Sequence, residues 1–373
     1  MKGKRMTNTN LMIVFWNLGI GGVQRKILDI VKYLGSQRGY RNLKVHLVLR
    51  DKRPFSLGEN EKLPQTYIHY FPESIKNASR FLFPLYILWK LLLIKPDTVL
   101  TFLHMASIYS IATTRVVFWR NTRVILNEDI LTSPDVQSKT KRRLIELLYP
   151  LADRIISPTT ASKNDLVKYF KLISKKIIVI PNWTVMKDRN PERHEKFDLL
   201  FVGRFTKQKN ISLLMHVSKQ LIGLHPDIKV CLVGEGEEQE FIEESVKKEG
   251  LGANISIIKP TANIRKYLLR SKIFVLTSHY EGMPIALLEA KALGIPAVVT
   301  SYPGAEEAVD NGKDGYICNT NIEFVERVHQ ILSDETLRGK LGKCALKRSR
   351  KEFSTSALRK FLTNILEAMK EVV

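Results

Sequence analysis

Two glutamates eight residues apart suggest a specific chemistry in this sequence. Glu281 and Glu289 frame the run EGMPIALLEA, in which a turn leads into an apolar stretch with helical spacing. A helix N-terminus favours anions, so the backbone of Gly282, Met283 and Pro284 is a candidate contact for phosphate or sugar. Glu289 falls among apolar residues, where a carboxylate needs partners such as sugar hydroxyls. A helix-terminal acid and a solvated helix face are the alternative interpretations of the two glutamates.

A second segment, VGRFTKQKN at 202–210, places two cations directly after a short apolar run. Gly203 allows a tight turn at the end of an expected strand. Arg204 and Lys209 follow within the same loop, where together they would neutralise a diphosphate, with the arginine fork binding two oxygens. Ordinary surface charge is the alternative interpretation in so basic a chain.

Two glycine turns also follow apolar runs. The first is Gly19-Ile20-Gly21-Gly22 and the second is Val233-Gly234-Glu235-Gly236. The first contains GxGG but not the full GxGxxG, so it is a weak dinucleotide fingerprint. At Gly21, Gly22 and Gly234 the backbone offers a surface that a phosphate or sugar can approach closely.

Helices and strands must position these residues. Short β-branched runs alternate with helical patterns along the chain. The expected strands are 11–16, 45–49, 98–102, 124–126, 154–156, 177–180, 199–202, 230–233, 255–258, 273–277 and 297–300. Such alternation predicts an α/β protein with parallel sheets covered by helices. Ligands bind beyond the carboxyl ends of parallel strands, where the candidate residues fall.

The alternation of apolar runs and helical patterns is interrupted once. Residues 186–196 are polar and contain a proline, which indicates a linker. We therefore expect an α/β domain at 1–185, a second α/β domain at 197–350, and a C-terminal helix at 351–373.

The motifs GGVQR, VGRFTKQKN, VGEGEE and EGMPIALLEA, in this order, resemble glycosyltransferase family 4 over roughly residues 11–350. ADRIISPTTASKNDL at 152–166 and VIPN at 179–182 resemble the same family. The resemblance implies the GT-B fold, with two Rossmann-like domains facing across a cleft and a C-terminal helix crossing back to the N-terminal domain. It implies that the domain at 1–185 binds the acceptor and that the domain at 197–350 binds the nucleotide sugar. It also implies a retaining transferase that uses a nucleotide-diphosphate sugar, with UDP favoured, and needs no metal or other cofactor.

The resemblance assigns roles residue by residue. Arg204 and Lys209 would hold the donor diphosphate, Glu281 would contact the donor sugar, and Glu289 would bind the ribose. Ile258 would lie near the base. The implied donor-binding residues are Gly21, Gly22, Gly203, Arg204, Lys209, Gly234, Ile258, Glu281, Gly282, Met283, Pro284 and Glu289. The sequence contains no D-x-D, which agrees with cations and helix N-termini, in place of a metal, stabilising the leaving diphosphate.

The chain departs from the family where many members carry a histidine near the reacting sugar. Here the segment reads Asn127-Glu128-Asp129, with Asp129 at the position of the histidine. Either carboxylate would hydrogen-bond a donor-sugar hydroxyl or orient the acceptor, and Asn127 is grouped with them. His104 is an alternative that offers an imidazole, although a hydrogen-bonded loop histidine is the plainer interpretation.

Composition narrows the class of protein. The 373 residues are 44% hydrophobic, which excludes disordered and collagen-like chains, and the formal net charge is +22. Residues 1–180 account for +18 of this charge and so predict an anionic partner. Three cysteines without a CxxC pair argue against a disulfide framework or zinc site, and the apolar run at 11–16 is too short for a signal peptide. We expect a cytoplasmic protein.

The apolar stretch at 81–94 has 14 residues, fewer than the roughly 20 that span a bilayer. It is either a buried helix or a helix at a membrane interface, where Tyr86, Trp89 and Lys90 would suit the headgroup depth. The basic cluster is Lys139, Lys141, Arg142 and Arg143. Together these features predict a glycan or glycolipid acceptor, such as a lipid-linked oligosaccharide or a lipopolysaccharide or capsule precursor. They favour peripheral attachment to an anionic surface, the inner face of the cytoplasmic membrane.

Two other classes remain open from the sequence. A different GT-B enzyme, a phosphorylase or a sugar-nucleotide epimerase, would share the fold. A basic nucleic-acid-binding protein would show salt-sensitive binding to DNA or RNA. The positive charge is dispersed and no nucleic-acid module is present, so we expect no nucleic-acid partner.

Overall fold

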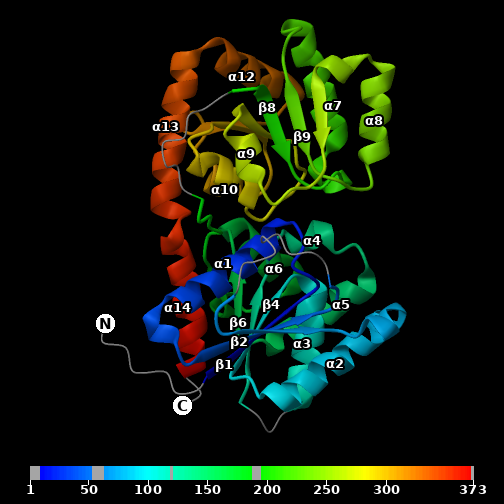
Figure 1. Ribbon diagram of the computed structural model, residues 1–373, viewed down its shortest axis with the longest axis vertical. Coiled ribbons are helices and arrows are strands. Elements are labelled where there is room, and N and C mark those ends of the chain that lie inside the picture. Colours follow the sequence, from blue (N-terminus) through cyan, green and yellow to red (C-terminus); the bar gives the residue numbers. More distant parts are fainter. Residues whose placement is uncertain (1–8, 53–62, 118–120, 187–194, 371–373) are drawn as a thin grey trace. The chain divides into compact units, whose positions relative to one another are not determined.

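The computed structural model describes residues 9–52, 63–117, 121–186 and 195–370. The chain forms two compact units, Met1–Pro181 with Ala357–Val373, and Asn182–Ser356. Each unit is a parallel sheet with helices packed against it (Figure 1). Most of the predicted linker at 186–196 lies outside the described residues.

The first unit contains a seven-stranded parallel sheet in the order β3-β2-β1-β4-β5-β6-β7. Its strands are β1 (Thr9–Phe15), β2 (Leu43–Leu49), β3 (Thr66–Tyr70), β4 (Thr98–Phe102), β5 (Arg123–Asn127), β6 (Arg154–Ser157) and β7 (Ile177–Val179). Its helices are α1 (Gly22–Ser36), α2 (Ser79–Ile94), α3 (His104–Val116), α4 (Thr132–Asp135), α5 (Lys139–Leu148), α6 (Thr160–Phe170) and α14 (Thr355–Lys370). The central strands β4 (TVLTF) and β5 (RVILN) are mostly apolar and are buried except for Arg123 at the start of β5, because helices cover both faces.

The second unit contains a six-stranded parallel sheet in the order β10-β9-β8-β11-β12-β13. Its strands are β8 (Phe197–Val202), β9 (Val230–Val233), β10 (Ile255–Ile258), β11 (Ser271–Leu276), β12 (Ala297–Thr300) and β13 (Gly315–Cys318). Its helices are α7 (Ile211–Leu224), α8 (Gln239–Lys248), α9 (Ile264–Leu268), α10 (Ile285–Ala292), α11 (Ala305–Ala308), α12 (Asn321–Ser333) and α13 (Glu335–Glu352).

The predicted fold class is confirmed, since both units are parallel sheets with alternating helices. The strands predicted at 98–102, 230–233, 255–258 and 297–300 coincide with β4, β9, β10 and β12, and the other predicted strands differ by one or two residues at an end. Two strands, β3 and β13, were not predicted. Both lie at a sheet edge, where the apolar signal is weaker.

The C-terminal helix α14 belongs largely to the first unit. Arg154 Nη1 donates to the Asn364 carbonyl at 2.9 Å, and Arg359 Nε donates to the Tyr33 hydroxyl at 2.9 Å. Phe361 and Ile365 are fully buried. The expected return of the last helix to the N-terminal unit is therefore confirmed.

Backbone contacts hold together the loops that follow β8 and β9. Gly203 N donates to Val233 O at 3.1 Å, and Phe205 N donates to Glu235 O at 2.9 Å. A Cβ atom on Gly234 would lie only 1.9 Å from Gly203 O. Gly234 is thus required for two backbone segments of the chain to approach each other.

We expect Gly234→Ala to lower the free energy of unfolding of the second unit by about 1–3 kcal/mol or more, because backbone atoms cannot move aside as a side chain can. Gly339→Ala on α13 is the matched control, since a Cβ atom there meets nothing within 4 Å. Urea denaturation monitors both variants. Equal midpoints for the two variants would contradict the packing argument.

Candidate active site

Lys209 and Glu281 meet in the second unit. Lys209 ends the 3₁₀ turn Lys207–Lys209 after β8, and Glu281 lies in the loop between β11 and α10. Lys209 Nζ forms an ion pair with Glu281 Oε1, and the two side chains are 13% and 8% exposed. Ser278 Oγ donates to the same carboxylate oxygen at 2.6 Å. One oxygen of Glu281 is therefore fixed by two partners.

Further hydrogen bonds join the same two loops. His279 N donates to Gln208 O at 2.9 Å, and Thr277 Oγ1 donates to Lys209 O at 2.9 Å. Gln208 Nε2 donates to Tyr280 O at 2.9 Å. The structure brings Lys209 and Glu281 together through this local framework, although 72 residues separate them in the chain.

The turn Gly282–Pro284 lies at the start of α10. The helix begins at Ile285 with Pro284 as its N-cap, so Gly282 and Met283 directly precede it. Contact between this backbone and a phosphate or sugar stays a prediction. Asn182 Nδ2 donates to Met283 O at 2.8 Å and holds this turn. Sequence reasoning did not select Asn182, although it ends the VIPN motif.

Glu289 lies on α10 and is 1% exposed, so the alternative of a solvated helix face was wrong. It falls one turn inside the helix. The predicted role of Glu289 as an acid that binds a ligand stays a prediction.

Further donor-site candidates lie in each of the two units. Arg204 is exposed, and among the described residues its guanidinium has no hydrogen-bond or ion-pair partner. Ile258 ends the edge strand β10, and its carbonyl accepts from Gly234 N at 2.9 Å. In the first unit, Gly21 is the N-cap of α1 and Gly22 is the first residue of that helix.

A buried polar network lies beyond β5 in the first unit. Glu128 is fully buried; Tyr149 OH donates to its Oε1 at 2.5 Å, and His104 Nδ1 lies 2.8 Å from its Oε2. His104 Nε2 lies 3.1 Å from Asp135 Oδ2. Burial would lower the pKa of His104, but the charge of Glu128 and the hydrogen bonds with Asp135 and Glu128 outweigh it and raise the pKa to about 10. His104 is therefore held protonated between two carboxylates.

Asp129, the neighbour of Glu128, has a different partner. Its Oδ1 lies 2.5 Å from Lys26 Nζ, and the side chains are 7% and 2% exposed. The sequence analysis did not select Lys26. The ion pair joins residues 103 positions apart, so local spacing carries no signal for it.

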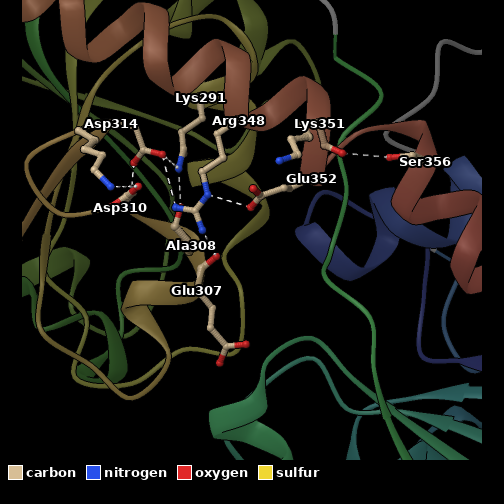
Figure 2. Close-up of polar contacts among 10 residues, drawn as sticks. Lys291, Glu307, Ala308, Asp310, Asp314, Arg348, Lys351, Glu352 and Ser356 are labelled. Atoms are coloured by element: carbon tan, nitrogen blue, oxygen red, sulfur yellow. Dashed lines mark hydrogen bonds and ion pairs between the residues drawn. The ribbon is translucent and has the colours of Figure 1, made fainter.

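A third buried charge anchors α10. Lys291 is fully buried, and its Nζ lies 2.8 Å from Asp314 Oδ2 and 2.5 Å from Ala308 O (Figure 2). Arg348 of α13 lies 3.4 Å from Asp314 and donates to Glu307 O at 2.8 Å. Burial lowers the pKa of Lys291 to about 8, while the charge of Asp314 opposes the shift. The network fixes the helix that carries Glu289.

Two family models together cover most of the chain. The model of glycosyltransferase family 4 matches residues 20–185, and the model of glycosyl transferases group 1 matches residues 184–348. The chain belongs to the family 4 glycosyltransferases. It is therefore a transferase with the GT-B fold.

Two named relatives are a glycosyltransferase of amylovoran biosynthesis and an N-acetylgalactosaminyltransferase. The amylovoran biosynthesis glycosyltransferase AmsD of Erwinia amylovora is 31% identical over 57% of this chain, and the alignment spans 62% of that relative, less than two thirds of its length. A Campylobacter jejuni protein is 27% identical over 88% of this chain and 91% of its own length. Its name is N-acetylgalactosamine-N,N'-diacetylbacillosaminyl-diphospho-undecaprenol 4-alpha-N-acetylgalactosaminyltransferase.

Solved structures share the fold. The crystal structure of Anabaena Alr3699/HepE in complex with UDP and glucose matches with a TM-score of 0.82 and 16% identity. The match covers 96% of this chain and 100% of that one. At this identity the likeness shows the GT-B fold alone.

Neither a metal cluster nor a membrane span is found in the part of the chain that the structure describes. No group of three or more His, Cys, Asp or Glu side chains there could hold a metal ion. None of the helices there is both long and apolar enough to cross a bilayer.

The His104 network predicts a pH-dependent stability. Because folding raises the pKa of His104, its stabilising contribution is complete below the unfolded pKa near 6.5 and is lost as pH rises through about 10. We expect the difference in unfolding free energy between wild type and His104→Gln to shrink by a few kcal/mol between pH 6.5 and 10. Denaturant titrations at each pH measure this difference. A difference independent of pH over that range would contradict a charged His104.

Proposed function

We propose that this transferase moves a hexose or N-acetylhexosamine, with retention of configuration, from a UDP-sugar to a glycan acceptor, without a metal ion. The observation that carries the proposal is the contact between Lys209 and Glu281 in the second unit. It sets a cation for a diphosphate beside a carboxylate for sugar hydroxyls, at the carboxyl ends of β8 and β11.

Glu281 is arranged to bind a hydroxyl. Its Oε1 is engaged by Lys209 and Ser278, while Oε2 has only a 3.5 Å contact with Gln208 Nε2 among the described residues. That second oxygen has capacity to accept from a donor-sugar hydroxyl. Glu289 would bind the ribose hydroxyls from α10.

Arg204 and Lys209 would supply the positive charge that the leaving group needs. The acceptor hydroxyl oxygen bonds to the anomeric carbon from the side of the leaving group while the bond from that carbon to the diphosphate oxygen breaks. The departing phosphate oxygen takes the acceptor proton, so no protein base is required. Negative charge builds on the diphosphate, and donors already in place stabilise it. Ile258 would lie near the base.

UDP is the favoured nucleotide. The Anabaena protein of the same fold has been solved with UDP and glucose, which supports this choice. The name of the Campylobacter relative includes a diphospho-undecaprenol acceptor, which supports a lipid-linked oligosaccharide here. Such an acceptor lies at a membrane surface, and we place the enzyme there as a peripheral protein on the inner face of the cytoplasmic membrane.

Helix α2 has the features of a membrane-contacting element. One face is buried through Phe83, Ile87 and Leu91. The opposite face exposes large apolar side chains, which are Phe81, Leu85, Trp89, Leu92 and Leu93. Lys90 lies over the Trp89 ring at 4.2 Å, a pairing suited to headgroup depth. The exposed basic residues Lys139, Lys141 and Arg143 on α5 add attraction to anionic lipid.

Arg204→Ala tests the proposed function. Nucleotide release is measured with UDP-glucose, UDP-galactose, UDP-N-acetylglucosamine, UDP-N-acetylgalactosamine and GDP-mannose, with a polyprenyl-diphosphate-linked sugar or water as acceptor. We expect kcat to fall on the order of 100- to 1000-fold, because a donor to the leaving group is lost. Lys207→Ala, an exposed lysine of the same loop, is the matched control and should retain activity. Normal turnover by Arg204→Ala would contradict the assignment of Arg204 to the donor diphosphate.

Vesicle binding tests the role of α2. We expect wild type to bind anionic phosphatidylglycerol vesicles at low salt, and Leu85→Gln/Trp89→Gln to bind roughly 10- to 100-fold more weakly, because each side chain loses apolar burial. Leu224→Gln, an exposed leucine of the second unit, is the control. Co-sedimentation measures binding. A wild type that ignores these vesicles would refute membrane attachment.

A further inference from the structure

Lys26 places an ammonium group in the interior of the first unit. Its Nζ lies 2.5 Å from Asp129 Oδ1 and 3.3 Å from Asn127 Oδ1. It also lies 5.8 Å from the centre of the Phe102 ring and 5.4 Å from that of Phe361 on α14. Burial lowers the pKa of Lys26, while the charge and hydrogen bond of Asp129 oppose the shift. A buried lysine is costly unless it is paired, so the ion pair with Asp129 accounts for its presence.

Two polar atoms beside Lys26 are not satisfied by these contacts. Asp129 Oδ2 and Asn127 Nδ2 are buried and have no hydrogen-bond partner within the described ranges of the chain. An unsatisfied buried polar group destabilises a folded protein, so a partner is expected for each. One atom accepts a hydrogen bond and the other donates one. A hydroxyl group does both and therefore matches the pair.

The neighbouring carboxylate does not share this capacity. Both oxygens of Glu128 face partners, Tyr149 on one side and His104 on the other. His104 also contacts Asp135 of α4. The titratable groups around the end of β5 thus form one network through Glu128 and a separate ion pair between Lys26 and Asp129.

We propose that Lys26 is a positioning residue, which holds Asp129 and Asn127 so that Asp129 Oδ2 and Asn127 Nδ2 bind one sugar hydroxyl. The inference rests on the proposed glycosyl transfer and assigns a sugar-binding position to the first unit. Lys26 itself touches no substrate. It sets the direction of the free oxygen of Asp129.

Removing the ammonium removes the partner that orients Asp129. Without Lys26, Oδ1 loses its ion pair and Oδ2 is no longer held toward the hydroxyl. An enzyme that lacks Lys26 should therefore lose sugar recognition, and a cation restored at the same position should recover it.

The test uses the full chain and the nucleotide sugar that releases most nucleotide in the panel above. For Lys26→Met we expect kcat/KM at pH 7 to fall on the order of 10- to 100-fold, as for loss of a hydrogen bond to a charged group. Lys26→Arg keeps the charge and should recover most of the loss, while UDP affinity stays unchanged in all variants.

Two further variants test the proposal if Lys26→Met folds poorly. They are Asp129→Asn and the double variant Lys26→Met/Asp129→Asn. The double variant removes both buried charges, so we expect its melting temperature to recover toward wild type while kcat/KM stays as low as in Asp129→Asn. If Asp129→Asn keeps wild-type kcat/KM, or Lys26→Met loses stability with kcat/KM unchanged, the positioning role is refuted and the transfer proposal stands. If wild type releases no nucleotide from any donor, both proposals fall.

Discussion

The ion pair between Lys209 and Glu281 fixes the candidate donor site, because the loops after β8 and β11 carry its cation and its carboxylate. Both side chains are largely buried, so each needs the other to offset the loss of water. Ser278 and the hydrogen bonds around Gln208 fix their direction. A carboxylate held in this way has one oxygen for the protein and one for a ligand. Charged and hydrogen-bonding groups that are positioned before the substrate binds stabilise the charge of the transition state.

Other buried charges follow the same pattern at the ends of strands and helices. In the first unit, Lys26 pairs with Asp129, and His104 lies between Glu128 and Asp135. Each pair joins segments distant in sequence, and breaking one partner would leave a buried charge alone. Buried ion pairs contribute little net stability but favour one arrangement of the chain. In this enzyme they lie next to the residues that we assign to sugar recognition.

Much of the fold could be predicted from the sequence, because buried parallel strands read as short apolar runs. The edge strand β3 was missed, since its sequence TYIHY is partly exposed and half polar. Glu281, Arg204 and Lys209 were selected because their motifs are local. Asn182 and Lys26 were not, because their roles depend on partners about 100 residues away. Local spacing cannot report such contacts, and only the packed structure brings them together.

The central claim is that the second unit binds a nucleotide-diphosphate sugar through protein cations, without a metal. Calorimetric titration of the full chain with UDP and GDP, repeated in EDTA, tests it most directly. The account predicts that UDP binds and that EDTA leaves its affinity unchanged. Loss of UDP binding in EDTA, or no binding of either nucleotide, would contradict it.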